Sequence, residues 1–197
     1  MLAVPDLTMY SSKNKRGFTL IEVLITIVIV AIALLGLAGL QVTSLNNQLE
    51  SYQRAQAMLL LEDMANRIRA NNAEARNNAY TVGNQYGLGA IENCALKTTT
   101  AARDLCERNT AISGAGITLN TQNAGSVLGA RGSIEYVTAA VGSSNCETHI
   151  RLTIAWQGLS PTKAPNDSVT CGKDQYGSPD SYRRVARLDN VLADLSL

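Results

Sequence analysis

The pattern of apolar and polar positions divides the chain near residue 40. From Phe18 to Leu40 almost every residue is apolar, and Glu22 is the one charged residue in this stretch. An apolar helix of about 20 residues is long enough to cross a lipid bilayer. We therefore expect residues 18–40 to form a membrane-spanning helix that carries one carboxylate near its start.

A short basic segment precedes the apolar stretch. Lys13, Lys15 and Arg16 stand just before it, and the leader can start at Met1 or at Met9. Basic residues beside a membrane-spanning helix are retained on the cytoplasmic side. The charge pattern therefore predicts an N-in, C-out orientation, with everything after residue 40 on the far side of the membrane.

Residues 41–70 are expected to continue the helix with one apolar face. No proline occurs between Phe18 and Ser160, and apolar residues recur at steps of three and four, as in an amphipathic helix. With the apolar stretch they predict a single helix about 80 Å long. We expect the stripe of this second half to be core of the exported domain. The stripe contains Val42, Leu45, Leu49, Tyr52, Leu59, Leu61, Met64, Ala65 and Ile68, with the polar Gln56 in step.

Residues 71–131 predict a long connection. This region is rich in Asn, Ala, Gly and Thr, and it holds Cys94 and Cys106. The one regular element expected in it is a short helix at Ala101–Glu107. Connections of this length are uncommon in compact domains and are often functional or cross-linked. We therefore expect a disulfide to close part of the region and its surface to make specific contacts.

Strand patterns occupy residues 132–197. Three segments are candidates, namely Ser133–Val141, Glu147–Gln157 and Tyr182–Leu192. The second is the clearest, because apolar residues at every other position, ending with Trp156, predict one buried face. Prolines and Gly158 mark the loop that follows it. We expect the three strands to form an antiparallel meander over the second half of the helix, which is an α+β fold.

Four cysteines lie beyond the apolar stretch: Cys94, Cys106, Cys146 and Cys171. An even number in an exported chain predicts two disulfides, formed in an oxidising compartment. Three pairings are possible, and the spacings favour Cys94–Cys106 with Cys146–Cys171. A zinc site is disfavoured, because no Cys-x-x-Cys occurs and His149 is the single histidine.

The sequence contains no recognisable catalytic constellation. His149 has no nucleophile partner in its segment and is expected to be a surface or packing residue. Asp174 and Asp180 share a loop, but two acids make a poor calcium site. We therefore predict a protein that is not an enzyme and needs neither a metal nor a cofactor.

Charge offers little support for nucleic-acid binding. The chain has a formal net charge of +1, which argues against a strongly cationic surface. Arg183, Arg184 and Arg187 cluster in the last predicted strand and are the best candidates for binding DNA or an acidic partner. The balanced charge favours a solvated face for these arginines instead.

The start of the apolar stretch, Gly17-Phe18-Thr19-Leu20-Ile21-Glu22-Val23 after a basic leader, resembles the type III signal of type IV pilins and type II secretion pseudopilins. The resemblance implies that residues 1–17 are a leader, that a prepilin peptidase cuts after Gly17, and that Phe18 becomes the methylated N-terminus. It assigns Glu22 to assembly. A carboxylate alone in an apolar span costs a few kcal/mol, and the new amine of a neighbouring subunit can pair with it.

A signal peptide and a plain membrane anchor account less well for the apolar stretch. A secretory signal peptide has an apolar region of about 7–15 residues, shorter than this one. A plain membrane anchor gives Glu22 no role. The pilin-like interpretation implies an inner-membrane precursor with its domain in the periplasm, and a place in the pilus after assembly.

A second resemblance lies at the end of the predicted helix. The stretch from Leu61 to Asn71, LEDMANRIRAN, resembles minor pilins of the type IV pilus modification group. This implies a low-abundance subunit that joins other minor pilins to prime assembly at the tip, and so supports twitching motility or adhesion. Its partners are then minor and major pilins, the prepilin peptidase and the inner-membrane assembly platform. A minor pseudopilin of type II secretion, or a pilin that binds DNA or another ligand, are the alternatives.

Overall fold

The computed structural model places the chain in two compact units, residues 1–45 and residues 46–197, which are treated one at a time. One helix, α1 (Leu20–Ala70), runs from the first unit into the second. The described residues are 17–81, 86–87, 92–114, 118–119, 122–123, 127–137 and 147–193.

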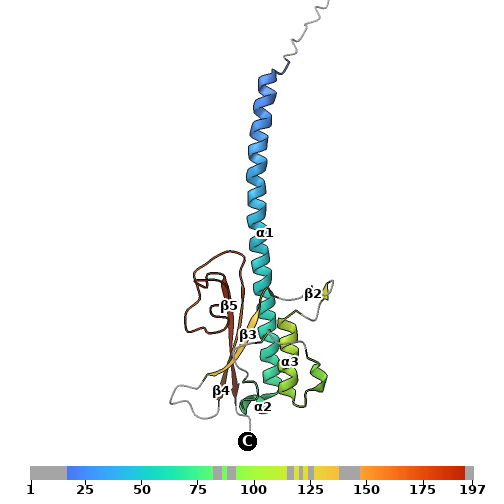
Figure 1. Ribbon diagram of the computed structural model, residues 1–197, viewed down its shortest axis with the longest axis vertical. Coiled ribbons are helices and arrows are strands. Elements are labelled where there is room, and N and C mark those ends of the chain that lie inside the picture. The colour runs from blue at the N-terminus through green and yellow to red at the C-terminus, as the bar shows by residue number, and fades with distance from the viewer. Residues whose placement is uncertain are drawn as a thin grey trace, which may run out of the picture. The chain divides into compact units, whose positions relative to one another are not determined.

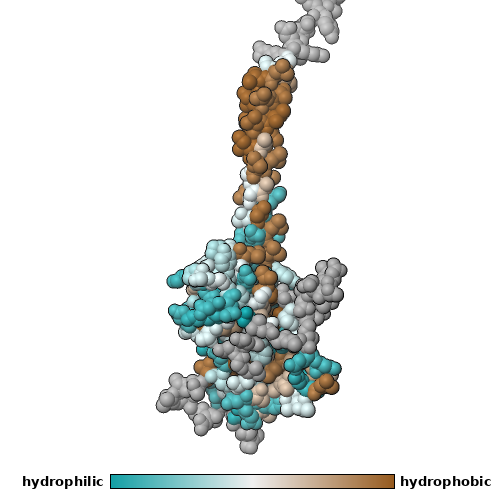
Figure 2. Space-filling model, viewed as in Figure 1, coloured by the Kyte–Doolittle hydropathy of each residue, from teal (hydrophilic) through white to brown (hydrophobic). Residues whose placement is uncertain are grey.

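The first unit consists of the apolar part of α1. This part is long and apolar enough to cross a membrane, and none of its most apolar 18-residue window is buried. Figure 2 shows the apolar side chains covering its surface. Because exposed apolar surface is unfavourable in water, this segment requires lipid or other helices around it.

The second unit contains a three-stranded antiparallel sheet in the order β3-β4-β5, as the α+β expectation requires (Figure 1). Strand β4 (Glu147–Gln157) has the predicted bounds, and β5 (Arg183–Ala193) begins one residue later than predicted. Strand β3 (Arg131–Val137) begins two residues earlier than predicted, and residues 138–141 of that prediction lie outside the described residues.

The main core lies between the sheet, the last part of α1 and the helix α3 (Thr100–Ile112) (Figure 1). Trp156, at the end of β4, is 3% exposed, which confirms that it is a core residue. Alternation along β4 directs apolar side chains inward from one face. The strands contribute Ile134, Ile150, Leu152, Ile154, Trp156 and Leu192, and α1 contributes Ala57, Leu61, Met64, Ala65 and Ile68.

The expectation that the whole apolar stripe of residues 41–70 is core was wrong. Leu49, Tyr52 and Leu59 are 52%, 61% and 58% exposed, whereas Leu61 and Ile68 are buried. At 3.6 residues per turn, the buried face is rotated by roughly 150° from these exposed residues. This part of α1 therefore has two apolar faces, and the domain covers one of them.

Two short helices and α3 fill the connection between α1 and the sheet. They are α2 (Asn72–Arg76), the 3-10 helix η1 (Cys94–Leu96) and α3 (Thr100–Ile112). The expected short helix is confirmed and extends further at both ends. Thr99 caps α3 by accepting a hydrogen bond from the Ala102 amide at 3.2 Å. A small two-stranded sheet, β1 (Thr118–Leu119) with β2 (Gln122–Asn123), follows.

A close approach of α3 to the edge of β3 requires glycine at two positions. Tyr86 and Gly132 form an antiparallel bridge beside β3. A Cβ at Gly132 would lie 2.9 Å from Cδ1 of Ile112, and one at Gly87 would lie 2.5 Å from Cγ2 of the same residue. Gly87 also has φ +91°, a conformation that favours glycine.

Candidate assembly and disulfide sites

The residues assigned to processing and assembly stand together at the start of α1. Thr19 is the residue before the helix, and its hydroxyl accepts a hydrogen bond from the Glu22 amide at 3.3 Å. The Thr19 carbonyl accepts from the Glu22 and Val23 amides at 3.1 and 3.3 Å. The Thr-x-x-Glu spacing is that of a capping box, which fixes where the helix begins. Gly17 and Phe18 therefore precede the first turn, and Glu22 lies within it.

Glu22 is the one ionisable residue among residues 17–45. A carboxylate in the first helical turn interacts favourably with the positive end of the helix dipole. The side chains around it are apolar and open, with Phe18 84% and Ile21 61% exposed. Chemically, this arrangement presents one hydrogen-bond-accepting anion on an otherwise apolar rod, where a cationic group of another molecule can meet it.

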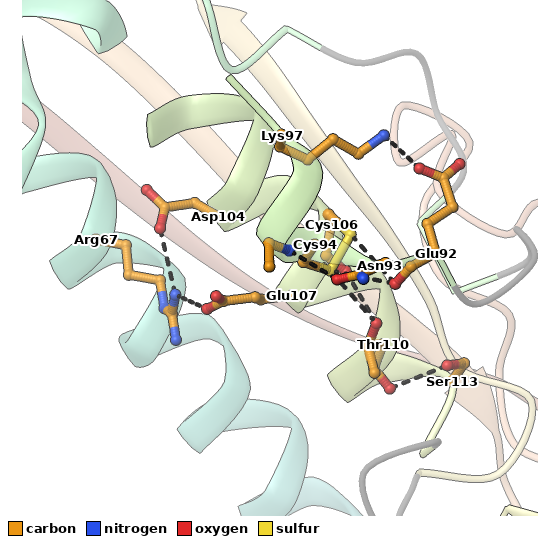
Figure 3. The surroundings of a disulfide bond; sticks show 11 residues. Arg67, Glu92, Asn93, Cys94, Lys97, Asp104, Cys106, Glu107, Thr110 and Ser113 are labelled. Carbon is orange, nitrogen blue, oxygen red and sulfur yellow. Dashed lines mark hydrogen bonds and ion pairs between the residues drawn. A yellow bond between two sulfur atoms is a disulfide. The ribbon is translucent and has the colours of Figure 1, made fainter. Parts of the chain in front are cut away.

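The first predicted disulfide is present in the structure. Cys94 and Cys106 are bonded, with their Cα atoms 5.5 Å apart, and the bond joins η1 to α3 (Figure 3). Asn93 caps η1 by accepting a hydrogen bond from the Ala95 amide at 3.1 Å. Lys97 forms an ion pair with Glu92 across the same short segment. The bridge therefore fixes a small surface element on α3.

The second predicted disulfide stays a prediction. Cys171 is a free, buried thiol, with its sulfur 3.5 Å from the Arg131 carbonyl. Burial raises the pKa of this thiol above its ordinary value. Its expected partner, Cys146, lies outside the described residues.

The last strand does not present a solvated arginine face. Arg183 is fully buried, with its Nε 2.7 Å from the Asp180 carboxylate, and it donates to the Val169 and Cys171 carbonyls at 2.7 and 3.0 Å. Arg187 remains exposed. The expectation was wrong for Arg183, because the loop before β5 folds back and uses its guanidinium to satisfy buried carbonyl groups.

Arg184 is also engaged, by a residue that sequence reasoning missed. Its guanidinium lies 3.1 Å from Glu50 on α1, and the same carboxylate oxygen accepts from the Leu159 and Ser160 amides at 3.0 and 3.3 Å. Burial raises the pKa of Glu50, but these backbone hydrogen bonds and the charge of Arg184 outweigh it and leave the pKa below 4.5. The partners are 134 positions apart, so no local pattern could reveal them.

A second contact that the sequence did not reveal connects α1 to α3. Arg67 lies 3.2 Å from Asp104 and 2.6 Å from Glu107 (Figure 3). It also lies 3.0 Å from Asp63. Asp104 also accepts a 2.7 Å hydrogen bond from the Tyr80 hydroxyl. Burial lowers the pKa of Arg67, but the three carboxylates outweigh it and raise the pKa overall. This cluster holds the disulfide-bearing helix against α1.

The remaining candidate residues occupy separate places. His149 lies on β4 with its Nε2 3.5 Å from Glu147. Asp180 is committed to Arg183, and Asp174 donates its backbone amide to the Asp180 carboxylate at 3.2 Å. Within the described ranges, no group of three or more His, Cys, Asp or Glu side chains is placed to hold a metal ion.

Models of known protein families match both halves of α1. Residues 12–38 match the family model of the prokaryotic N-terminal methylation motif, and residues 39–111 match that of type IV pilin Tt1218. The second match covers the rest of α1, the disulfide and nearly all of α3. No curated protein and no solved structure matches the chain. The chain is therefore similar to the prokaryotic N-terminal methylation motif over residues 12–38 and to type IV pilin Tt1218 over residues 39–111.

Proposed function

We propose that this protein is a structural subunit of a type IV pilus. The chain is made as a prepilin, cut after Gly17 and methylated on Phe18, and it packs its apolar helix against the helices of other pilins. The observation that carries the proposal is the position of Glu22. It is the one ionisable group in residues 17–45, which include the exposed apolar part of α1, and α1 begins two residues after the expected cut.

Energetics favour a partner for Glu22. On insertion scales an ionised side chain costs about 2.5–3.5 kcal/mol at the centre of a membrane helix. The cost is lower near the end of the span, where Glu22 lies, but it still favours a partner. Cleavage after Gly17 supplies an amine on Phe18, and the capping box keeps that amine outside the helix, at its end. Pairing of one subunit's amine with a neighbour's Glu22 compensates both charges and fixes the axial position of the two helices.

The exposed stripe of the second unit supports the same proposal. Leu49, Tyr52 and Leu59 leave large apolar side chains on the surface of α1, although the domain has a separate core. Such a stripe, at helical spacing, is suited to packing against another helix. We infer that neighbouring pilin helices cover it in the filament.

We further propose that the subunit is a minor pilin. The resemblance of residues 61–71 to the pilus modification group supports this, and Arg67 in that stretch connects α1 to α3. In this role the protein joins other minor pilins to prime assembly at the tip, and it supports twitching motility or adhesion. We therefore expect deletion of its gene to reduce the number of surface pili. We also expect immunogold labelling to find the protein at pilus tips.

A minor pseudopilin of type II secretion is the second candidate, because such proteins carry the same kind of N-terminal signal. Deletion distinguishes the two: loss of pili with normal protein secretion supports the pilus, and the reverse supports secretion. A DNA-binding role is less favoured, because Arg183 and Arg184 are already engaged with Asp180 and Glu50.

The assembly role is tested with Glu22→Gln, which removes the charge and keeps the shape. We expect the variant to be cleaved normally but to be depleted from sheared pili relative to membranes. Glu62→Gln, an exposed position of the same helix outside the apolar span, serves as the matched control. Equal incorporation of both variants would refute the role of Glu22.

A further inference from the structure

A buried arginine in the second unit lacks a carboxylate partner. Arg108, on α3, is 5% exposed, and its guanidinium donates to the Leu60 carbonyl of α1. Arg67 beside it has three carboxylates, whereas the described residues provide no ion pair for Arg108. The field of Asp63 reaches Arg108, but that carboxylate is already paired with Arg67 at 3.0 Å. Arg108 therefore carries a buried charge without a neutralising contact.

The Tyr86 hydroxyl is a second unsatisfied group close to it. Tyr86 is 5% exposed and is fixed by backbone hydrogen bonds of 2.9 and 3.1 Å with Gly132. Among the described residues, its buried oxygen has no hydrogen-bond partner. Burial raises the pKa of this phenol, so it stays protonated at neutral pH and can donate a hydrogen bond. Leaving such a buried donor unpaired is unfavourable.

Arg108 and Tyr86 line one small cavity of about 10 Å³. That volume suits a single species of the size of a water molecule or a monatomic ion. Ser133 and Thr153 also line it, but they neighbour Ile134 and Leu152 along their strands, so alternation directs their side chains to the other face of the sheet. The apolar lining residues are Leu61, Met64, Ile112, Ile134 and Leu152.

We propose that this cavity binds one monatomic anion, such as chloride, between the Arg108 guanidinium and the Tyr86 hydroxyl. Both groups donate hydrogen bonds, and the remaining side chains directed into the cavity are apolar. A water molecule would accept the hydrogen bond of the phenol but leave the buried cation uncompensated. An anion accepts that hydrogen bond and also neutralises the charge of Arg108. The bound ion connects α3, the Tyr86–Gly132 bridge beside β3, and α1 through the Leu60 contact.

The test uses the full-length chain in detergent micelles. Thermal unfolding is followed by the fluorescence of Trp156, the single tryptophan, which is 3% exposed. Chloride is titrated against gluconate at constant ionic strength, because gluconate is too large for the cavity. We expect the Tm to rise with chloride and then follow the logarithm of its concentration, as for a ligand of the folded state. Equal Tm values in chloride and gluconate would overturn the proposal.

Variants separate this site from general salt effects. Tyr86→Phe removes only the unpaired hydroxyl and should fold, but its chloride-dependent Tm shift should fall by at least half. Arg108→Met should lose the shift entirely, and Arg103→Met, at an exposed position of the same helix, should keep it. An undiminished shift in Tyr86→Phe would contradict the proposal even if Arg108→Met fails to fold. In crystals grown with bromide, an anomalous peak between Arg108 and Tyr86 supports it, and an ordered water there overturns it.

Discussion

Removal of the Cys94–Cys106 bridge should destabilise the second unit by an amount that follows from its position. The bonded residues are 12 positions apart. Closing a loop of that length lowers the conformational entropy of the unfolded chain, which corresponds to about 3 kcal/mol of free energy at 25 °C. The 3-10 helix that carries Cys94 has no buried residue, so alanine substitution there removes no core packing. Loss of loop closure is therefore the dominant effect expected in a Cys94→Ala/Cys106→Ala variant.

For a domain of roughly 150 residues, each kcal/mol corresponds to about 2–4 °C in Tm. The double variant should therefore unfold about 6–12 °C below the wild type, as followed by Trp156 fluorescence of the full chain in micelles. A reductant should lower the wild-type Tm by at least as much. If Cys146 and Cys171 form the second bridge, the double variant keeps a reductant response of its own. A decrease of less than about 2 °C in the oxidised double variant would refute the loop-closure reasoning.

Two further predictions concern α1. Tyr52→Ser and Leu59→Ser should change the free energy of unfolding by less than about 0.5 kcal/mol, because both side chains are exposed, yet both should reduce recovery in sheared pili. Leu96→Ser, at a 77% exposed position on η1, is the control, and equal recovery of all three would contradict a packing role for the stripe. Stability should also fall in acid, because the pKa of Glu50 is lower in the folded protein than its ordinary value of 4.5. The ionised Glu50 carboxylate therefore stabilises the fold fully above pH 4.5, and this stabilisation disappears as the pH falls through the pKa of the folded state. Glu50→Gln should therefore lower the Tm at pH 7 and flatten its decrease below pH 4.5, and an unchanged acid profile would contradict the contact with Arg184.

The sequence predicts the elements whose signals are local. Strand β4 has the bounds expected for it because large apolar residues occupy every other position from Ile150 to Trp156. The apolar run predicts a helix from Phe18, and α1 begins two residues later, at Leu20. The spacing of Cys94 and Cys106 favours the observed bridge. Each of these features is determined by residues close together in the chain.

The sequence does not predict what depends on distant partners. Helical periodicity shows that α1 has apolar residues at helical spacing, but only the position of the sheet decides that Leu61 is inside and Tyr52 outside. Arg183 looks like a surface cation until the loop before β5 buries it against Asp180. Glu50 gives no signal of its own, because its partner Arg184 lies in the last strand.

The central claim, that the chain is processed as a pilin before its helix assembles, is tested most directly at its N-terminus. The measurement is intact mass and N-terminal sequencing of the protein recovered from membranes, with and without the prepilin peptidase. We predict a mature chain that starts at N-methylated Phe18 and appears only when the peptidase is present. A chain that keeps Lys13–Gly17 in both strains, or one cut further along near Ala38, would remove the proposed partner of Glu22 and contradict the account.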